Sequence, residues 1–115
     1  MSALSVLTAQ VDAFNAHDLE RFVATYAEDA VIAGAADHVI EGHAAMRAHY
    51  AQRLANPDLR CDIDATVIFG DRWVVAREQI SNGAGLIEVI ATFEVVAGVI
   101  RRASMLKNDG SDTQV

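Results

Sequence analysis

In the first half of the chain, hydrophobic residues recur every three or four positions in three segments, and this spacing predicts three helices. Asp18 is placed to cap the second helix, and Gly42 opens the third, which ends before Pro57 because proline cannot continue a helix. Between these helices, the stretches "DAVIAG" (29–34) and "HVIEG" (38–42) predict two short strands. The residues expected to face the core are, helix by helix, Leu4, Leu7, Val11 and Phe14; Leu19, Phe22, Val23 and Tyr26; and Met46, His49, Tyr50 and Leu54.

From residue 60 onward the pattern changes to a period of two, which predicts strands. The turns "FGDR", "NGAG" and "AG" separate residues 60–69 from "WVVAREQIS", "LIEVIATFEVV" and "VIRRASML". Strands joined in this way form an antiparallel meander, and the helices must cover one face of it. The sequence therefore predicts a single α+β domain over residues 1–107 and a frayed polar tail over 108–115. The first strand is expected to face the core with Cys61, Ile63, Ala65, Val67 and Phe69.

The hairpin around "NGAG" decides which side chains share a face of the sheet. A loop of two or four residues centred on Gly83 and Ala84 would turn Glu78 toward the helices, whereas a loop of three or five would turn it to solvent. We expect the inward register. It pairs Ile80 with Ile87, Gln79 with Glu88, Glu78 with Val89, and Ala76 with Ala91.

Polar side chains on the helix stripes converge on Glu78 in this arrangement. They are Gln10, Tyr26, His49 and Tyr50. A buried polar group without a partner costs about 1 to 3 kcal/mol, so these groups form either a hydrogen-bonded network or the lining of a wet cavity. A cavity favours a ligand site, and burial there would raise the pKa of Glu78 above its ordinary value of about 4.3.

The net charge limits the classes of possible binding partners, and the cysteine content indicates the compartment. Nine basic and sixteen acidic residues give a net charge of −7, which excludes nucleic acid and an anionic membrane surface as partners. A lone cysteine, Cys61, and a start without a signal sequence lead us to expect a cytoplasmic protein. The four histidines show no metal-ligand spacing, so we expect neither a metal site nor a cofactor.

Three stretches, "FNAHDLERFVATYAEDAVIAG", "EGHAAMRAHYAQRL" and "GDRWVVAREQISNGAGLIEVIATFEVVAGVIRRA", resemble the nuclear transport factor 2-like superfamily, which includes SnoaL-like polyketide cyclases and ketosteroid isomerases. The likeness covers residues 4–107 and specifies the fold better than the activity. It implies a cone-shaped, curved, mostly antiparallel sheet wrapped around three helices, with a pocket at its open end. It also implies a homodimer through the outer sheet face, which here presents Trp73 and Val75.

The resemblance disfavours two activities of that superfamily. The base, the second acid and the oxyanion-hole tyrosine of the isomerases fall, in that order, on Gly34, Ala91 and Gln10. The two accessory pocket tyrosines match Tyr26 and Tyr50. The "R-x-D" motif of limonene epoxide hydrolases appears only as Arg77 followed by Gln79, without its aspartate.

Two function classes remain open. In the first, a SnoaL-like pocket binds, or transforms without a cofactor, a small and mostly apolar carbonyl compound, with Glu78 as acid or base and His49 as its partner or proton relay. In the second, the domain is a non-catalytic dimeric association or ligand-binding scaffold whose inner polar groups satisfy one another. The expected pocket lining is Gln10, Tyr26, Tyr50, Ala76, Val89, Ala91, Phe93 and Met105.

Overall fold

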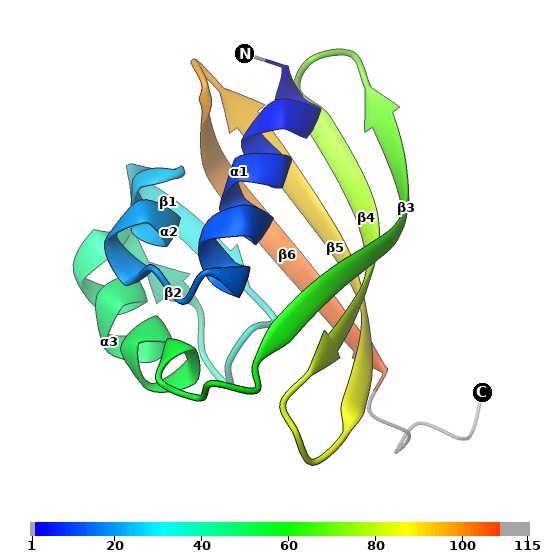
Figure 1. The fold of residues 1–115 in the computed structure, drawn as a ribbon. Helices are drawn as coiled ribbons and strands as arrows, with labels where there is room; N and C mark the ends of the chain where they lie inside the picture. The colour runs from blue at the N-terminus through cyan, green and yellow to red at the C-terminus, as the bar shows by residue number, and fades with distance from the viewer. Residues whose placement is uncertain (1, 109–115) are drawn as a thin grey trace.

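Three helices lie against one face of a curved six-stranded sheet (Figure 1). The structure is a computed structural model, and it describes residues 2–108. In chain order its elements are α1 (Ala3–Asn15), α2 (Leu19–Ala24), β1 (Tyr26–Ala33), β2 (Ile40–Glu41), α3 (Gly42–Leu54), β3 (Arg60–Phe69), β4 (Trp73–Ser81), β5 (Leu86–Val96) and β6 (Val99–Asn108). The expected α+β class and the meander of four strands are confirmed.

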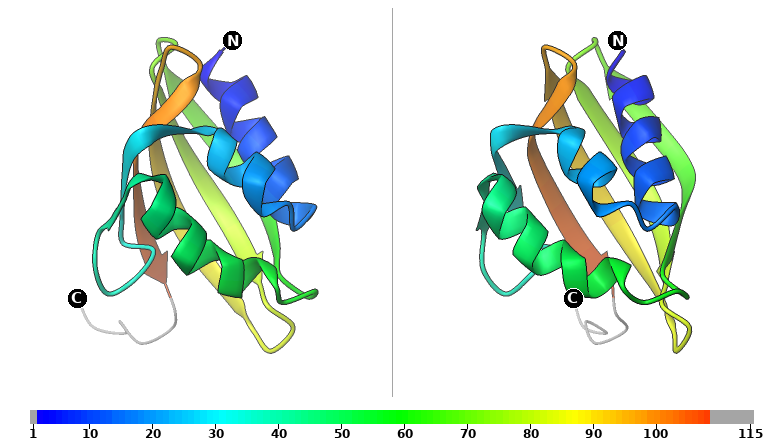
Figure 2. Two further views of the ribbon diagram at one scale, coloured as in Figure 1. Left: turned by 90° about the vertical axis from the view of Figure 1, so that its left-hand side faces the viewer. Right: turned by 60° about the vertical axis from the view of Figure 1, so that its left-hand side comes forward.

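The sheet has the strand order β2-β1-β6-β5-β4-β3 and does not close on itself. All neighbouring strands are antiparallel except β1 and β6, which run parallel. Figure 2 shows the helices gathered on the inner side of the curved sheet. Within residues 2–108, no helix is long and apolar enough to cross a membrane.

The end of the domain differs by one residue from the expectation. Asn108, assigned from the sequence to a frayed tail, is the last residue of β6 and pairs with Glu88. The remainder of that predicted tail, 109–115, lies outside the described residues.

The β4–β5 hairpin has the register that the sequence predicts. Ser81 pairs with Leu86, so a loop of four residues, 82–85, joins the strands, and Glu78 pairs with Val89. The Asn82 side chain organises this loop by accepting hydrogen bonds from the backbone N–H groups of Ala84 and Gly85, at 2.9 and 3.0 Å. As a result Glu78 faces the helices, and only 4% of its surface is exposed.

The edge strand β3 departs from its predicted alternation. An irregularity between Ile63 and Ala65 adds one unpaired residue to β3, and every side chain beyond it changes face. Val67 therefore pairs with Val75 on the outer face of the sheet, and its surface is 54% exposed. The expectation that Ala65, Val67 and Phe69 face the core is wrong for this reason.

Two residues predicted on the helix stripes differ from the expectation. Because α2 ends at Ala24, Tyr26 is the first residue of β1 and not part of a helix, although it is buried. Leu4 is 38% exposed, at the edge of the stripe that α1 turns to the sheet. That stripe consists of Ala3, Val6, Leu7, Gln10, Ala13 and Phe14.

A buried acid on the outer sheet face joins three segments. The Glu94 carboxylate accepts hydrogen bonds from Arg102 of β6, at 2.8 Å, and from Arg72 of the β3–β4 turn, at 2.7 Å. These arginines cover it completely. The hydrogen bond from Arg102, supported by the one from Arg72, lowers the pKa of Glu94 to about 2, so this carboxylate is ionised at neutral pH.

Candidate functional site

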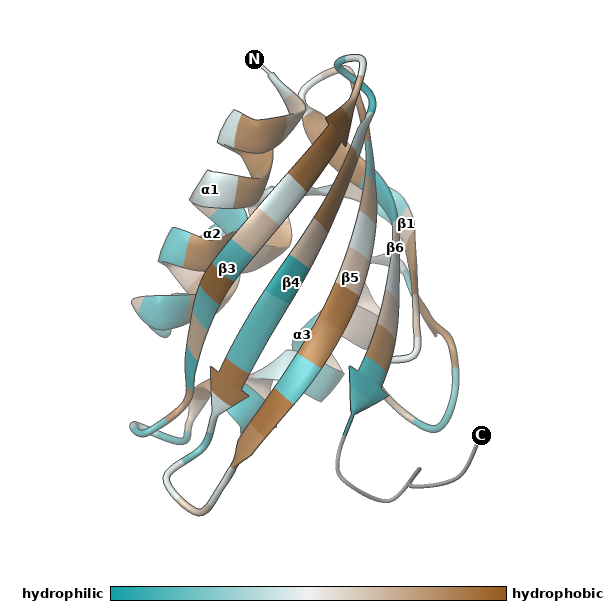
Figure 3. Ribbon diagram, turned by 90° about the vertical axis from the view of Figure 1, so that its right-hand side faces the viewer, coloured by the Kyte–Doolittle hydropathy of each residue, from teal (hydrophilic) through white to brown (hydrophobic). Residues whose placement is uncertain are grey.

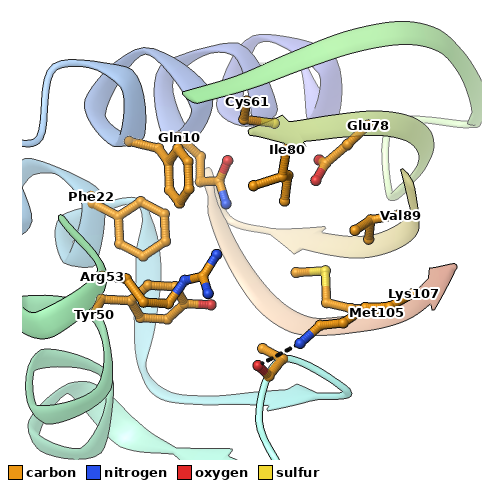
Figure 4. A pocket seen from close by; sticks show the side chains of 12 residues that line it. Gln10, Phe22, Tyr50, Arg53, Cys61, Glu78, Ile80, Val89, Met105 and Lys107 are labelled. Atoms are coloured by element: carbon orange, nitrogen blue, oxygen red, sulfur yellow. Dashed lines mark hydrogen bonds between the residues drawn. The ribbon is translucent and has the colours of Figure 1, made fainter. Parts of the chain in front are cut away.

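A pocket lies between the helices and the inner face of the sheet (Figure 4). Its walls combine apolar side chains with a few convergent polar groups, the combination typical of small-molecule sites. The lining residues are Gln10, Phe14, Phe22, Ala35, Tyr50, Arg53, Cys61, Glu78, Ile80, Val89, Met105 and Lys107.

The pocket is small. Its free volume is about 50 Å³, room for a few water molecules and well below the ~300–1,000 Å³ of pockets that enclose a whole drug-sized ligand. In this conformation it therefore admits one small molecule or the end of a longer one.

The structure brings only part of the predicted lining to this pocket. Gln10, Tyr50, Glu78, Val89 and Met105 line it as expected. The others are buried in the hydrophobic core and do not line this pocket. These core residues are Tyr26, Ala76, Ala91 and Phe93.

Glu78 is the acidic side chain of the pocket. Its carboxylate points from β4 into the same space as the Gln10 amide from α1 (Figure 4). Burial raises the pKa of Glu78 from its ordinary value of 4.5 to about 7, and a hydrogen bond with Cys61 opposes part of that rise. Near neutral pH the carboxyl group can therefore either accept or donate a proton.

Cys61 is a neighbour of Glu78 and not a nucleophile. The thiol is buried, and burial, followed by the nearby charge of Glu78, raises its pKa far above the ordinary range. A thiol held in its protonated form does not attack electrophiles, so Cys61 serves the site as a small wall residue.

Two tyrosines stand at different depths beside the pocket. Tyr26 is fully enclosed, its hydroxyl accepts a 3.0 Å hydrogen bond from Gln10 Nε2, and burial raises its pKa well above 10. Tyr50 turns its hydroxyl into the pocket (Figure 4), and burial raises its pKa to about 12. Both phenols stay protonated at neutral pH, and Phe22 packs against both, with ring centroids 5.5 and 4.6 Å away.

His49 does not reach the pocket. Its ring packs edge-on against Tyr50 at 4.8 Å, and its buried Nε2 has no hydrogen-bond partner in the described part of the chain. Burial and then the charge of Arg53 lower the pKa of His49 below 6.5, so the ring is neutral at pH 7. The predicted pairing of His49 with Glu78 is not seen, because His49 packs against Tyr50 and does not line the pocket that Glu78 faces.

The sequence reasoning missed two cations at the pocket. Arg53 lies in the last turn of α3, and Lys107 of β6 donates a 2.9 Å hydrogen bond to the backbone oxygen of Ala35. The signal for Arg53 was present in the spacing, since it follows Tyr50 by three residues and so shares its helix face. Among the described residues no cluster of three or more His, Cys, Asp or Glu side chains could hold a metal ion.

The backbone at Gly34 leaves no room for a side chain. The backbone of Gly34 has a φ of +82°, and a Cβ at this position would collide with the backbone oxygen of Met105. No side chain can therefore be placed at the position where the resemblance puts the isomerase base.

Comparison with known proteins identifies one family and many similar folds. The family model of the SnoaL-like domain matches residues 7–103. No match is found among curated proteins. A cystatin-fold protein from Novosphingobium aromaticivorans is 24% identical, with a TM-score of 0.82 over 92% of this chain and 98% of its own.

Two further structures carry a description of function. A candidate polyketide cyclase from Sinorhizobium meliloti is 18% identical, with a TM-score of 0.77 over 92% of this chain and 100% of its own. The epoxide hydrolase/cyclase-like enzyme SalBIII, which has a role in pyran ring formation in salinomycin, is 15% identical, with a TM-score of 0.78 over 93% of this chain and 91% of its own. At such low sequence identities, the structural similarity shows that these proteins share a fold with this chain.

The raised pKa of Glu78 predicts how stability changes with pH. The folded protein holds the Glu78 proton more tightly than the unfolded chain, so the free energy of unfolding falls as pH rises from 4.5 to about 7. Glu78→Gln cannot titrate. We expect its stability relative to wild type to improve by about 3 kcal/mol between about pH 4.5 and pH 8, measured by urea unfolding.

Glu88→Gln provides the matched control, because it removes a half-buried carboxylate from the outer face of the neighbouring strand. Its stability relative to wild type should change little over the same range. A constant difference between Glu78→Gln and wild type would show that Glu78 is solvated in the folded state.

Proposed function

The chain belongs to the SnoaL-like domain family, and from that premise we propose that it binds a small, mostly apolar carbonyl compound and transfers a proton on it through Glu78, without a cofactor. The observation that supports this most strongly is a carboxyl group 4% exposed, in an apolar pocket, with a pKa of about 7. General acid–base groups work best when their pKa lies near the working pH. The proposed setting is the cytoplasm, where a free thiol such as Cys61 stays reduced.

The reaction step follows from the positions of the polar groups. Ionised Glu78 accepts a proton from the carbon next to the carbonyl. The electron pair of the broken C–H bond forms a carbon–carbon double bond, and the π pair of the carbonyl moves onto its oxygen to give an enolate. The Tyr50 hydroxyl and the second N–H of Gln10, whose other N–H binds Tyr26, are placed to donate hydrogen bonds to this oxygen. Return of the proton from Glu78 to a different carbon of an unsaturated substrate completes an isomerisation. In a ring closure the enolate carbon bonds to a second carbonyl carbon of the substrate, the π pair of that carbonyl moves onto its oxygen, and this oxygen takes the proton from Glu78.

His49 takes a supporting role in this proposal. Its neutral ring packs against Tyr50, so it positions the tyrosine and does not relay protons. The functions described for similar folds fit the proposed chemistry, because polyketide cyclisation and pyran ring formation both need a group that gives or takes a proton.

Exchange of carbon-bound hydrogen tests the proposal directly. In D₂O containing 2-butanone, whose carbonyl end suits the small pocket, we expect the protein to speed exchange at the carbons beside the carbonyl, as followed by proton NMR. The rate should rise with pH and level off above about 7, where Glu78 is ionised. Glu78→Gln should lower the protein-dependent rate by about 100-fold or more.

Glu88→Gln should retain the wild-type rate, since this residue lies on the other face of the sheet. Exchange by Glu78→Gln at the wild-type rate, or wild-type exchange no faster than in buffer, would contradict the proposed proton transfer.

A non-catalytic association domain is the second candidate function. The small volume of the pocket favours it, and so do exposed apolar residues of β3 that pair with β4 on the outer face of the sheet, the face that Figure 3 turns to the viewer. This outer apolar surface includes the predicted Trp73 and Val75. Beyond the irregularity in β3, Val67 and Phe69 also face this side, and they are 54% and 57% exposed.

We propose that a second copy of the chain covers this outer apolar surface, in a homodimer.

Oligomeric mass tests this interface. Phe69→Glu places a charge on the apolar surface, at the end of β3, so we expect it to shift the protein from dimer to monomer in sedimentation measurements. Val39→Glu makes the same change at an exposed valine before β2 and should leave the dimer intact. A wild-type protein that sediments as a monomer would contradict the proposed interface.

A further inference from the structure

We propose that the ligand of this pocket carries a carboxylate, which Arg53 binds at one side of the pocket. The other end of the ligand, an apolar chain that carries the carbonyl group, reaches Glu78. This inference rests on the proposed function and names its substrate class: short oxo acids, with a carbonyl group and a carboxylate a few bonds apart.

The charge of Arg53 has no acidic partner in the structure of residues 2–108. An exposed arginine, Arg101, shares this property, but Arg53 is half-buried and lines the pocket. The arginines that do lie within 4.0 Å of an acidic side chain are Arg21, Arg47, Arg60, Arg72, Arg77 and Arg102. A half-buried guanidinium without a counter-ion is well suited to bind an anion.

Glu78 does not serve as that counter-ion. Arg53 extends from α3 and Glu78 from β4, on different walls of the pocket (Figure 4). Burial and the Cys61 hydrogen bond account for the pKa of Glu78, whereas the positive charge of Arg53 acts on His49 and Tyr50. The pocket therefore has a cationic side and an acid–base side that do not neutralise each other.

The surroundings of Arg53 suit a carboxylate that keeps some water. Besides the pocket, Arg53 lines a second, more open hollow between the end of α3 and the β4–β5 loop. The other residues of that hollow are Gln52, Asn56, Leu59 and Asn82. A carboxylate bound by the guanidinium fork would thus face polar groups and solvent on its outer side, which limits the free-energy cost of removing water from it.

A second cation strengthens the selection for an anion. Lys107 lines the same pocket from β6, so two of the nine basic residues in a chain of net charge −7 converge on one small cavity. Cationic side chains at the wall of a cavity attract an anionic ligand to it.

Binding of a matched pair of probes tests the inference without requiring turnover. The probes are 4-oxopentanoate and its uncharged methyl ester, with dissociation constants from NMR titration of the ¹⁵N-labelled protein. We expect wild type to bind the acid at least about tenfold more tightly than the ester. Arg53→Gln should abolish this preference and leave the ester affinity unchanged, while Arg53→Lys keeps part of it.

Arg101→Gln removes the same charge from an exposed position and should keep the full preference. Equal binding of acid and ester by wild type, or a preference that survives in Arg53→Gln, would overturn the carboxylate assignment and leave the proposed pocket chemistry standing. Binding of neither probe by wild type would overturn both.

Discussion

The register of the β4–β5 hairpin is the constraint on which the site depends. A four-residue loop held by the Asn82 side chain places Glu78 opposite Val89 and turns it toward the helices. One residue more or less in that loop would move Glu78 to the outer face, where Arg77 and Gln79 now lie. The same register also places Glu94 on the outer face, where Arg72 and Arg102 cover it.

The two buried carboxyl groups of this sheet show how surroundings set their chemistry. Glu94 is enclosed by two guanidinium groups, which hold its pKa at about 2, and it serves to join strands. Glu78 is enclosed by apolar side chains and a thiol, which leave its pKa at about 7. Because no cation of residues 2–108 is paired with Glu78, its ionisation above neutral pH lowers the free energy of unfolding. A loss of stability of this kind is characteristic of functional sites.

The sequence was sufficient for the features that short-range patterns determine. Helical spacing and the "NGAG" turn predicted α3, the hairpin register and the inward position of Glu78. The sequence did not predict features that depend on how the elements pack in three dimensions. The irregularity in β3 that reverses Val67 leaves no mark on an evenly alternating sequence, and the short length of α2, which places Tyr26 on a strand, follows from packing. The spacing places Arg53 on the helix face of Tyr50, but only the assembled pocket shows that no acidic side chain of residues 2–108 pairs with it.

The protonation of Glu78 in the folded protein is the central claim, and its pKa is the measurement that tests it most directly. A carbon-detected NMR titration of the side-chain carboxyl, assigned by comparison with Glu78→Gln, should give a pKa of about 7. That value would place a desolvated carboxyl group in the pocket and support acid–base chemistry near neutral pH. A pKa near 4.5 would mean a solvated carboxylate, and the domain would then be better explained as an association or binding scaffold.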